Sequence, residues 1–149
     1  MTTDKIKEMM DACYLAKRIR DMLPELPKGV APSYIHYLDV IRKLEKKNRR
    51  VKISDISDAL NLPRPGVTRT VKEMEMKGYL DKISSEEDGR ITYVAITEEG
   101  KKLSDKYDRK YYGELSRYLD HISEEDADCM IRTLESLYQV MCERRIELE

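Results

Sequence analysis

LNLPRPGVTRTVKEMEMKGYL, residues 60–80, decides the fold, because it holds a turn, a helix start and a helix stop within one short run. Pro65 suits the first turn of a helix, where its missing N–H would lack a partner in any case. Gly78 is typical of the position that follows a helix C-terminus. A second short helix, DISDALNL at residues 55–62, comes just before, with Ser54 as its expected N-cap. The pair predicts a helix-turn-helix.

One face of the helix that starts at Pro65 carries cationic side chains. At about 100° per residue, Val67, Val71 and Met74 fall on one stripe, which we expect to pack against the preceding helix. The opposite face is free and suits a DNA major groove, since Lys and Arg neutralise phosphates and Arg can bind guanine through two hydrogen bonds. The predicted DNA contacts of this segment are Arg64, Pro65, Thr68, Arg69 and Lys72. An ordinary solvated helix face is the alternative.

A β-hairpin is predicted directly after this helix. YLDKIS and ITYVAIT, residues 79–84 and 91–97, are rich in β-forming residues, and the polar segment between them holds Asp88 and Arg90. A long cationic side chain on a protruding hairpin can reach into a minor groove, where the potential is most negative. Asp88 is placed to hold the Arg90 guanidinium through a charge-assisted hydrogen bond. The alternative is an exposed arginine paired with Asp88 and nothing more.

A strongly basic segment lies before the helix-turn-helix. RKLEKKNRRVK, residues 42–52, has seven Lys or Arg residues and one Glu, whereas residues 98–149 have nine basic and fourteen acidic residues. The chain therefore has one side suited to an anionic partner, although its formal net charge is only −1. The remaining predicted DNA contacts are Arg49, Arg50, Lys52 and Ser54. A solvated helix end is the alternative for this segment.

The rest of the chain is predicted as helices with apolar stripes. Residues 4–23 and 33–47 form two of them, a long helix follows Thr97, and a last helix opens at Ser123. The predicted fold class is mainly α with a small β-hairpin wing, in which a winged helix-turn-helix core carries N- and C-terminal dimerisation helices. The predicted regions are 33–101 for DNA binding and 1–32 with 102–149 for helical dimerisation.

The dimer is predicted because the stripes of the first and last helices exceed what the small DNA-binding lobe can cover. A two-fold protein on a two-fold operator also needs such an interface. Packing of these helices within one chain is the alternative.

Residues 53–101 resemble the MarR family of bacterial and archaeal regulators. The matching pieces are LNLPRPGVTRTVKEMEMKGYL, the DGR of the wing and the TEEGK that opens the next helix. The chain departs from the family pattern in having Ile96–Thr97 where Leu-Thr is usual. The resemblance implies a homodimer that binds a pseudo-palindromic operator in double-stranded DNA. It also implies repression of transcription until a small molecule or an oxidant releases the operator.

The resemblance assigns roles to four residues. Thr68 and Arg69 take the recognition-helix positions. Arg90 takes the wing position in the minor groove, and Asp88 is the wing acid that orients it.

The sequence indicates the regulatory signal less clearly than it indicates the DNA contacts. All aromatic residues are tyrosines, ten in number. The predicted lining of a cleft for a small aromatic effector is Tyr34, Tyr37, Tyr107 and Tyr111. The alternative is that these tyrosines are core. A redox-sensing regulator that uses Cys13 is another alternative, against an inert thiol.

Other classes of function find little support. We identify no phosphate-binding glycine loop, no metal-ligand cluster and no usable His, Ser or Cys constellation, so we expect no enzyme, no cofactor and no metal. No apolar run approaches membrane-span length, and the three widely spaced cysteines predict no disulfide, as in a cytoplasmic protein without a membrane partner. A winged-helix module that binds protein instead of DNA is the competing interpretation.

Overall fold

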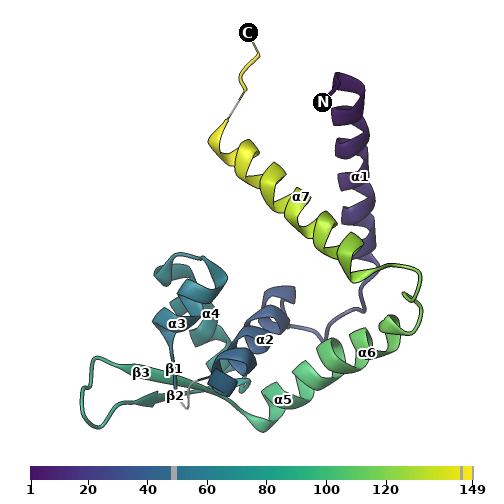
Figure 1. The fold of residues 1–149 in the computed structure, drawn as a ribbon. Coiled ribbons are helices and arrows are strands. Elements are labelled where there is room, and N and C mark those ends of the chain that lie inside the picture. Colours follow the sequence, from purple (N-terminus) through teal and green to yellow (C-terminus); the bar gives the residue numbers. More distant parts are fainter. Residues whose placement is uncertain (48–49, 145, 149) are drawn as a thin grey trace. The chain divides into compact units, whose positions relative to one another are not determined.

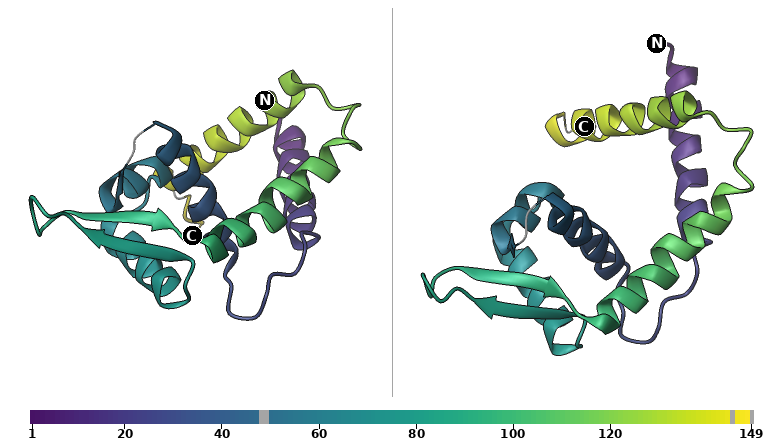
Figure 2. Two further views of the ribbon diagram at one scale, coloured as in Figure 1. Left: turned by 90° about the horizontal axis from the view of Figure 1, so that it is seen from below. Right: turned by 60° about the horizontal axis from the view of Figure 1, so that its bottom comes forward.

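The computed structural model describes residues 1–47, 50–144 and 146–148, which divide into two compact units, Met1–Arg109 and Lys110–Glu149. The first unit (Figures 1 and 2) contains α1 (Thr3–Asp21), α2 (Pro32–Lys47), β1 (Val51–Lys52), α3 (Ile53–Leu60), α4 (Arg64–Met76), β2 (Leu80–Ser84), β3 (Thr92–Ile96) and α5 (Glu98–Ser104). The π-helical turn η1 (Asp105–Lys110) follows, and the second unit contains α6 (Tyr111–Ser116) and α7 (Glu124–Glu143). Mainly helical structure with a small hairpin wing is therefore confirmed.

The three strands form one antiparallel sheet in the order β1-β3-β2. Val51 lies opposite Val94, and Leu80 lies opposite Ile96. All four side chains are buried, so one face of the sheet lies on the core. The tip of the β2–β3 hairpin projects well beyond α3 and α4, as the views of Figures 1 and 2 agree.

The core joins this sheet to α2, α3 and α4. Its buried members are Tyr34, Tyr37, Leu38, Ile41, Val51, Ile56, Val67, Val71, Met74, Leu80, Val94, Ile96 and Leu103. Val67, Val71 and Met74 have no exposed surface, which confirms the predicted stripe of α4. Because burying a side chain of this size stabilises the fold by about 1.5–3 kcal/mol, these three residues fix which face of α4 is left free.

Most of the predicted helix ends are confirmed. Gly78 follows α4 with a φ of 80°, in the left-handed region that glycine tolerates best. The hydroxyl of Thr97 accepts the N–H of Gly100 and caps α5, and that of Ser123 accepts the N–H of Asp126 and caps α7. The sequence signals at these positions act as expected.

The predicted N-cap at Ser54 is wrong. Helix α3 begins two residues earlier than predicted, at Ile53, and its N-cap is Lys52. The backbone N–H of Lys52 donates to the carboxylate of Asp55 at 2.9 Å. Strand β1 continues directly into α3. Asp55 therefore caps the helix by accepting the backbone N–H of Lys52, the last residue of the strand, and Ser54 lies within the first helical turn.

The long helix predicted after Thr97 is interrupted. Its regular turns end at Ser104, η1 intervenes, and α6 ends at Ser116, so Tyr118 and Leu119 lie beyond it. A π-helical turn holds an extra residue in its hydrogen-bonded ring, which shifts the apolar positions after it out of register with those before it. The single apolar period read from the sequence does not account for this shift.

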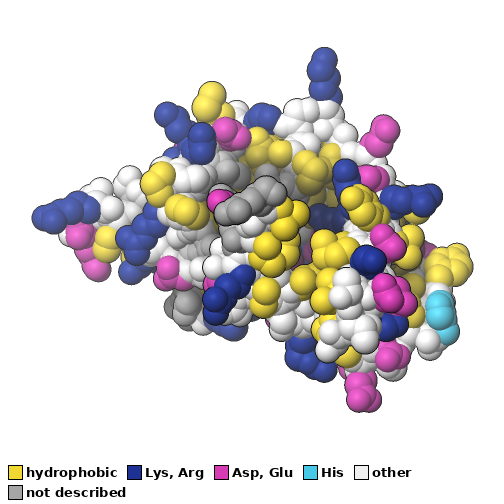
Figure 3. Space-filling model, turned by 90° about the horizontal axis from the view of Figure 1, so that it is seen from above, with side chains coloured by type: hydrophobic (Ala, Val, Ile, Leu, Met, Phe, Trp, Pro, Cys, Tyr) yellow, Lys and Arg dark blue, Asp and Glu magenta, His cyan; other side chains and the backbone are white. Residues whose placement is uncertain are grey.

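Helices α1 and α7 each carry an apolar stripe that their own unit leaves uncovered. No residue of α1 or α7 is buried, and both helices lie wholly within the described residues. The exposed side chains are Ile6, Met10, Tyr14, Leu15 and Ile19 on α1 and Met130, Ile131, Leu134, Tyr138 and Met141 on α7. Figure 3 shows hydrophobic side chains, in yellow, open to solvent on the face that it draws.

Candidate nucleic-acid interface

The free face of α4 presents cationic and hydroxyl side chains to solvent. Thr68, Arg69 and Lys72 are exposed, and Arg64 is exposed in the first turn. Within the residues that the structure describes, none of the ion pairs involves Arg64, Arg69 or Lys72. These cations are therefore open to a partner's phosphates or base edges.

The start of α4 adds backbone donors to this face. Its N-cap is Pro63, whose side chain makes no capping hydrogen bond. The N–H groups of a first helical turn have no partner within the helix, and with the helix dipole they attract phosphate. Pro65 offers no N–H of its own, so the donors at this end are those of Arg64 and Gly66.

A short, fully bonded turn sets the position of α4 against α3. Asn61 takes the left-handed conformation, with a φ of 51°, which Asn adopts at lower cost than most residues. The hydroxyl of Ser57 donates to the carbonyl of Leu62, and the N–H of Leu62 donates back to the carbonyl of Ser57 at 3.1 Å. The turn thereby places the start of α4 without using its exposed face.

The wing tip is built by its own hydrogen bonds. The N–H of Ser85 donates to the carbonyl of Ile91, and the N–H of Ile91 donates to the carbonyl of Asp88, both at 2.9 Å. The hydroxyl of Ser85 accepts the N–H groups of Glu87 and Asp88 at 3.3 Å each. The Asp88 carboxylate accepts the N–H of Arg90 at 3.0 Å.

Asp88 therefore positions the backbone of Arg90. The distance from Arg90 Nε to Asp88 Oδ1 is 3.9 Å, which is an ion-pair contact but too long for a hydrogen bond. The Arg90 side chain is 95% exposed. In Figure 3, Lys and Arg side chains stand out at the narrow left end, where the hairpin projects. The backbone of Arg90 is therefore fixed by hydrogen bonds, and its side chain is free to extend away from the protein.

The structure describes part of the basic segment at residues 42–52. Arg49 lies outside the described residues. The Arg50 guanidinium lies over the ring of Tyr93, 5.2 Å from its centre, and exposed Lys52 is opposite Tyr93 in the β1–β3 register. Ser54 is half-buried in the first turn of α3. The roles of these residues in DNA binding stay predictions, as do those of α4 and the wing.

The four tyrosines assigned to an effector cleft occupy different environments. Tyr34 and Tyr37 are 3% and 4% exposed, and Tyr107 packs against the same core. Tyr111 belongs to the second unit. The hydroxyl of Tyr34 donates to Glu73 on α4 at 3.1 Å. The side chains of Tyr34 and Tyr37 are thus part of the core, and an aromatic ligand among the tyrosines stays a prediction.

Replacing Tyr34 by phenylalanine is expected to lower the free energy of unfolding by about 1 kcal/mol, because Glu73 loses a neutral donor but remains accessible to water. Urea unfolding at one fixed protein concentration measures this. Tyr37→Phe is the matched control, since within the described residues the Tyr37 hydroxyl makes no hydrogen bond; its loss is expected to be below about 0.5 kcal/mol. Equal losses in the two variants would contradict a role for the Tyr34–Glu73 bond.

The three cysteines are free thiols. Cys13 is half-exposed on α1, and Cys129 and Cys142 are exposed on α7. In the part of the chain that the structure describes, no three His, Cys, Asp or Glu side chains are grouped so that they could hold a metal ion. None of the described helices has the length and apolar character needed to cross a membrane.

Comparison with known families finds one domain match. Residues 33–100 match the winged helix DNA-binding domain. This range covers α2 to the start of α5, and so includes the free face of α4 and the wing. It leaves out α1 and α7.

Curated relatives are similar at low identity. The HTH-type transcriptional regulator BilQ of Clostridioides difficile is 26% identical over 88 residues, which are 59% of this chain and 57% of that protein. The chain therefore spans little more than half the length of this relative.

Solved structures are similar over more of the chain. Streptococcus pneumoniae FabT in complex with DNA has a TM-score of 0.65 at 22% identity, over 95% of this chain and 99% of that one. A mutant MarR from E. coli complexed with operator DNA has a TM-score of 0.58 at 14% identity, over 73% and 76% of the two chains. At these identities the likeness establishes a shared fold.

Proposed function

We propose that this chain, a winged helix DNA-binding protein with the fold of MarR-type regulators, is a homodimeric transcriptional repressor that binds a pseudo-palindromic operator. The observation that carries the proposal is the free face of α4. Arg64, Arg69 and Lys72 are exposed there beside uncapped backbone donors, and Arg90 projects from the wing of the same unit. The relative named above is called a transcriptional regulator, and FabT and MarR were each solved on DNA.

The uncovered stripes of α1 and α7 support the proposed dimer. Each presents at least five large apolar side chains to solvent. Contiguous apolar surface of this kind is typical of an interface between subunits. A second copy of the chain is the simplest occupant, because two recognition helices related by a two-fold axis read two half-sites of a palindrome.

Repression and its release complete the proposal. A dimer seated on an operator near a promoter excludes the transcription machinery, and a small effector that favours a conformation unfit for DNA lifts that exclusion by its differential affinity.

A genomic selection tests the proposal. Purified protein is mixed with sheared DNA from its own organism at moderate salt, and bound fragments are sequenced. We expect a few fragments that share an inverted repeat, bound by two copies of the chain as measured by sedimentation. Binding that shows no preferred fragment, although it weakens with salt, would contradict an operator-specific regulator.

A reporter gene placed after a selected fragment tests the direction of regulation. Expression of the protein is expected to lower reporter output. An increase would contradict the repressor part of the proposal and leave the DNA-binding part intact.

A further inference from the structure

A hollow of about 350 Å³ lies on the first unit, away from the free face of α4 and from the wing tip. Its lining residues are Arg42, Glu45 and Lys46 from α2, Ile96 from β3, Lys101 from α5 and Arg109 from η1. All six belong to the same compact unit. The size is that of a site for a small molecule.

The charges around the hollow favour an anion. Four of its six lining side chains are cations and one is an acid; two of these cations, Arg42 and Arg109, also contact the Asp105 carboxylate, at 2.8 Å and 4.0 Å. Lys46 is exposed and, within the described residues, has no ion-pair partner. The hydrogen bond to Glu98, at 2.8 Å, raises the pKa of Lys101 and keeps it charged. Ile96, which is 9% exposed, adds an apolar contact.

Arg42 is the most enclosed of these cations. Its side chain is 15% exposed and donates to the Asp105 carboxylate at 2.8 Å and to the carbonyl of Lys101 at 3.2 Å. A guanidinium has five N–H donors in a fixed fork, so two bonds leave others for an anion. Arg42 is therefore held in place by the protein and still has capacity to bind.

Resting on the function proposed above, we propose that this hollow is the effector site and that the effector is a small dianion, such as a phosphate monoester, with an apolar portion. The dianion contacts Lys46, Arg109 and the remaining donors of Arg42, and its apolar portion lies on Ile96. This chemistry differs from the uncharged or singly charged aromatic ligand that a tyrosine-lined cleft suits.

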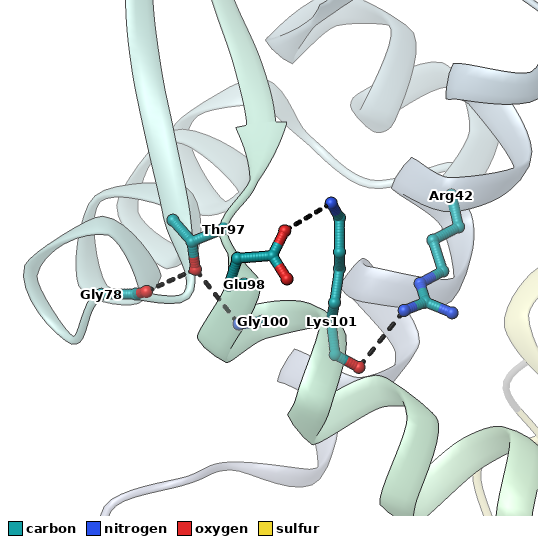
Figure 4. Close-up of polar contacts among 6 residues, drawn as sticks. All are labelled: Arg42, Gly78, Thr97, Glu98, Gly100 and Lys101. Atoms are coloured by element: carbon teal, nitrogen blue, oxygen red, sulfur yellow. Dashed lines mark hydrogen bonds and ion pairs between the residues drawn. The ribbon is translucent and has the colours of Figure 1, made fainter.

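Figure 4 shows how this site connects to the recognition helix. Arg42 bonds to the backbone of Lys101 in α5. At the start of the same helix, the Thr97 hydroxyl donates to the carbonyl of Gly78 at 2.6 Å and accepts the N–H of Gly100 at 3.1 Å. Gly78 directly follows the last turn of α4.

A bound dianion acts on this connection. It attracts Arg42 toward the hollow, and because Arg42 stays bonded to the carbonyl of Lys101, the first turn of α5 shifts with it. The hydrogen bond from Thr97 to Gly78 transmits this shift to the end of α4. Effector and operator are then coupled, and each lowers the affinity for the other by the same factor.

Calorimetry with phenyl phosphate tests the site without DNA. We expect phenyl phosphate to bind the protein, benzoate to bind at least about ten-fold more weakly, and the double variant Lys46→Gln, Arg109→Gln to lose at least about ten-fold in affinity for phenyl phosphate, since each lost charge contact weakens binding several-fold. Arg69→Gln, which removes a cation from the free face of α4, is the matched control and should bind phenyl phosphate as the parent does. Absence of binding, or a loss in Arg69→Gln equal to that of the double variant, overturns the site.

A second measurement tests the coupling. Phenyl phosphate at saturation is expected to weaken operator binding about five-fold or more in the parent and not in the double variant. Equal release in both overturns the coupling. Because the calorimetric test uses no DNA, failure to find an operator leaves its result unaffected, and a specific operator with no anion binding overturns this inference alone.

Discussion

Replacing Gly100 by alanine is expected to lower the free energy of unfolding by about 3 kcal/mol, the upper end of the range for overpacking a close contact. A Cβ at this position would overlap the carbonyl oxygen of Tyr79 and come within 2.8 Å of Ile96 Cγ2. The oxygen belongs to the backbone, which cannot move aside as a flexible side chain does. The first turn of α5 must therefore separate from Tyr79, and Gly78, which Thr97 contacts, is displaced with it.

Gly113→Ala is the matched control for this experiment. Gly113 lies in α6, and a Cβ there meets no atom within 4 Å. Because alanine favours a helix over glycine by up to about 1 kcal/mol, Gly113→Ala should leave stability unchanged or raise it. Urea unfolding of the variants and the parent at one protein concentration gives the comparison. A Gly100→Ala protein as stable as the parent would show that α5 does not pack tightly on Tyr79.

Arg90→Ala is expected to weaken operator binding by about 5- to 150-fold while the thermal midpoint stays the same. The side chain is 95% exposed and its ion-pair contact with Asp88 is 3.9 Å long, so its removal leaves the folded unit intact. The Asp88 carboxylate still accepts the N–H of residue 90, so the tip keeps its shape. The lost affinity then reports the contact of one guanidinium with DNA.

Arg117→Ala controls for the loss of an arginine in general. Arg117 is exposed, and within the described residues its one ion pair is the local contact with Glu114. Fluorescence anisotropy with a selected operator, at several salt concentrations, measures both variants. We expect Arg90→Ala to bind more weakly throughout and Arg117→Ala to match the parent. Arg90→Ala binding as tightly as the parent would falsify the role of the wing tip in DNA binding.

Local signals made several helix ends of both units predictable. Gly78, Thr97 and Ser123 end or start helices by backbone geometry and short-range hydrogen bonds, so a few neighbouring letters suffice to find them. The stripe of Val67 and Val71 is found by periodicity for the same reason. Ser54 failed because the competing cap, Asp55 bonded to Lys52, depends on a strand whose partner β3 is about 40 residues further along the chain.

The candidate site likewise contains some residues that local sequence indicates and others that it does not. Arg69 and Arg90 could be proposed from sequence because a free helix face and a hairpin tip are recognisable in it, and their DNA contacts stay predictions. The proposed effector site could not, because Arg42, Lys101 and Arg109 come from three elements whose meeting depends on the tertiary fold. The tyrosines are conspicuous by their number, but the burial of Tyr34 and Tyr37 depends on the packing of α2 against α3, α5 and the sheet, which composition does not reveal.

The wing tip is held by hydrogen bonds among its own residues, which affects how its sequence can evolve. Its hydrogen bonds join only residues 85–91, so the shape of the tip does not depend on the rest of the molecule. On α4, by contrast, exposed positions alternate with the buried Val67, Val71 and Met74 within one or two residues. If the wing tip contacts the operator as proposed, a lineage can therefore alter its preferred operator flanks by single substitutions at the tip and keep a folded protein at every step. The recognition helix allows such drift only at the positions between its buried ones.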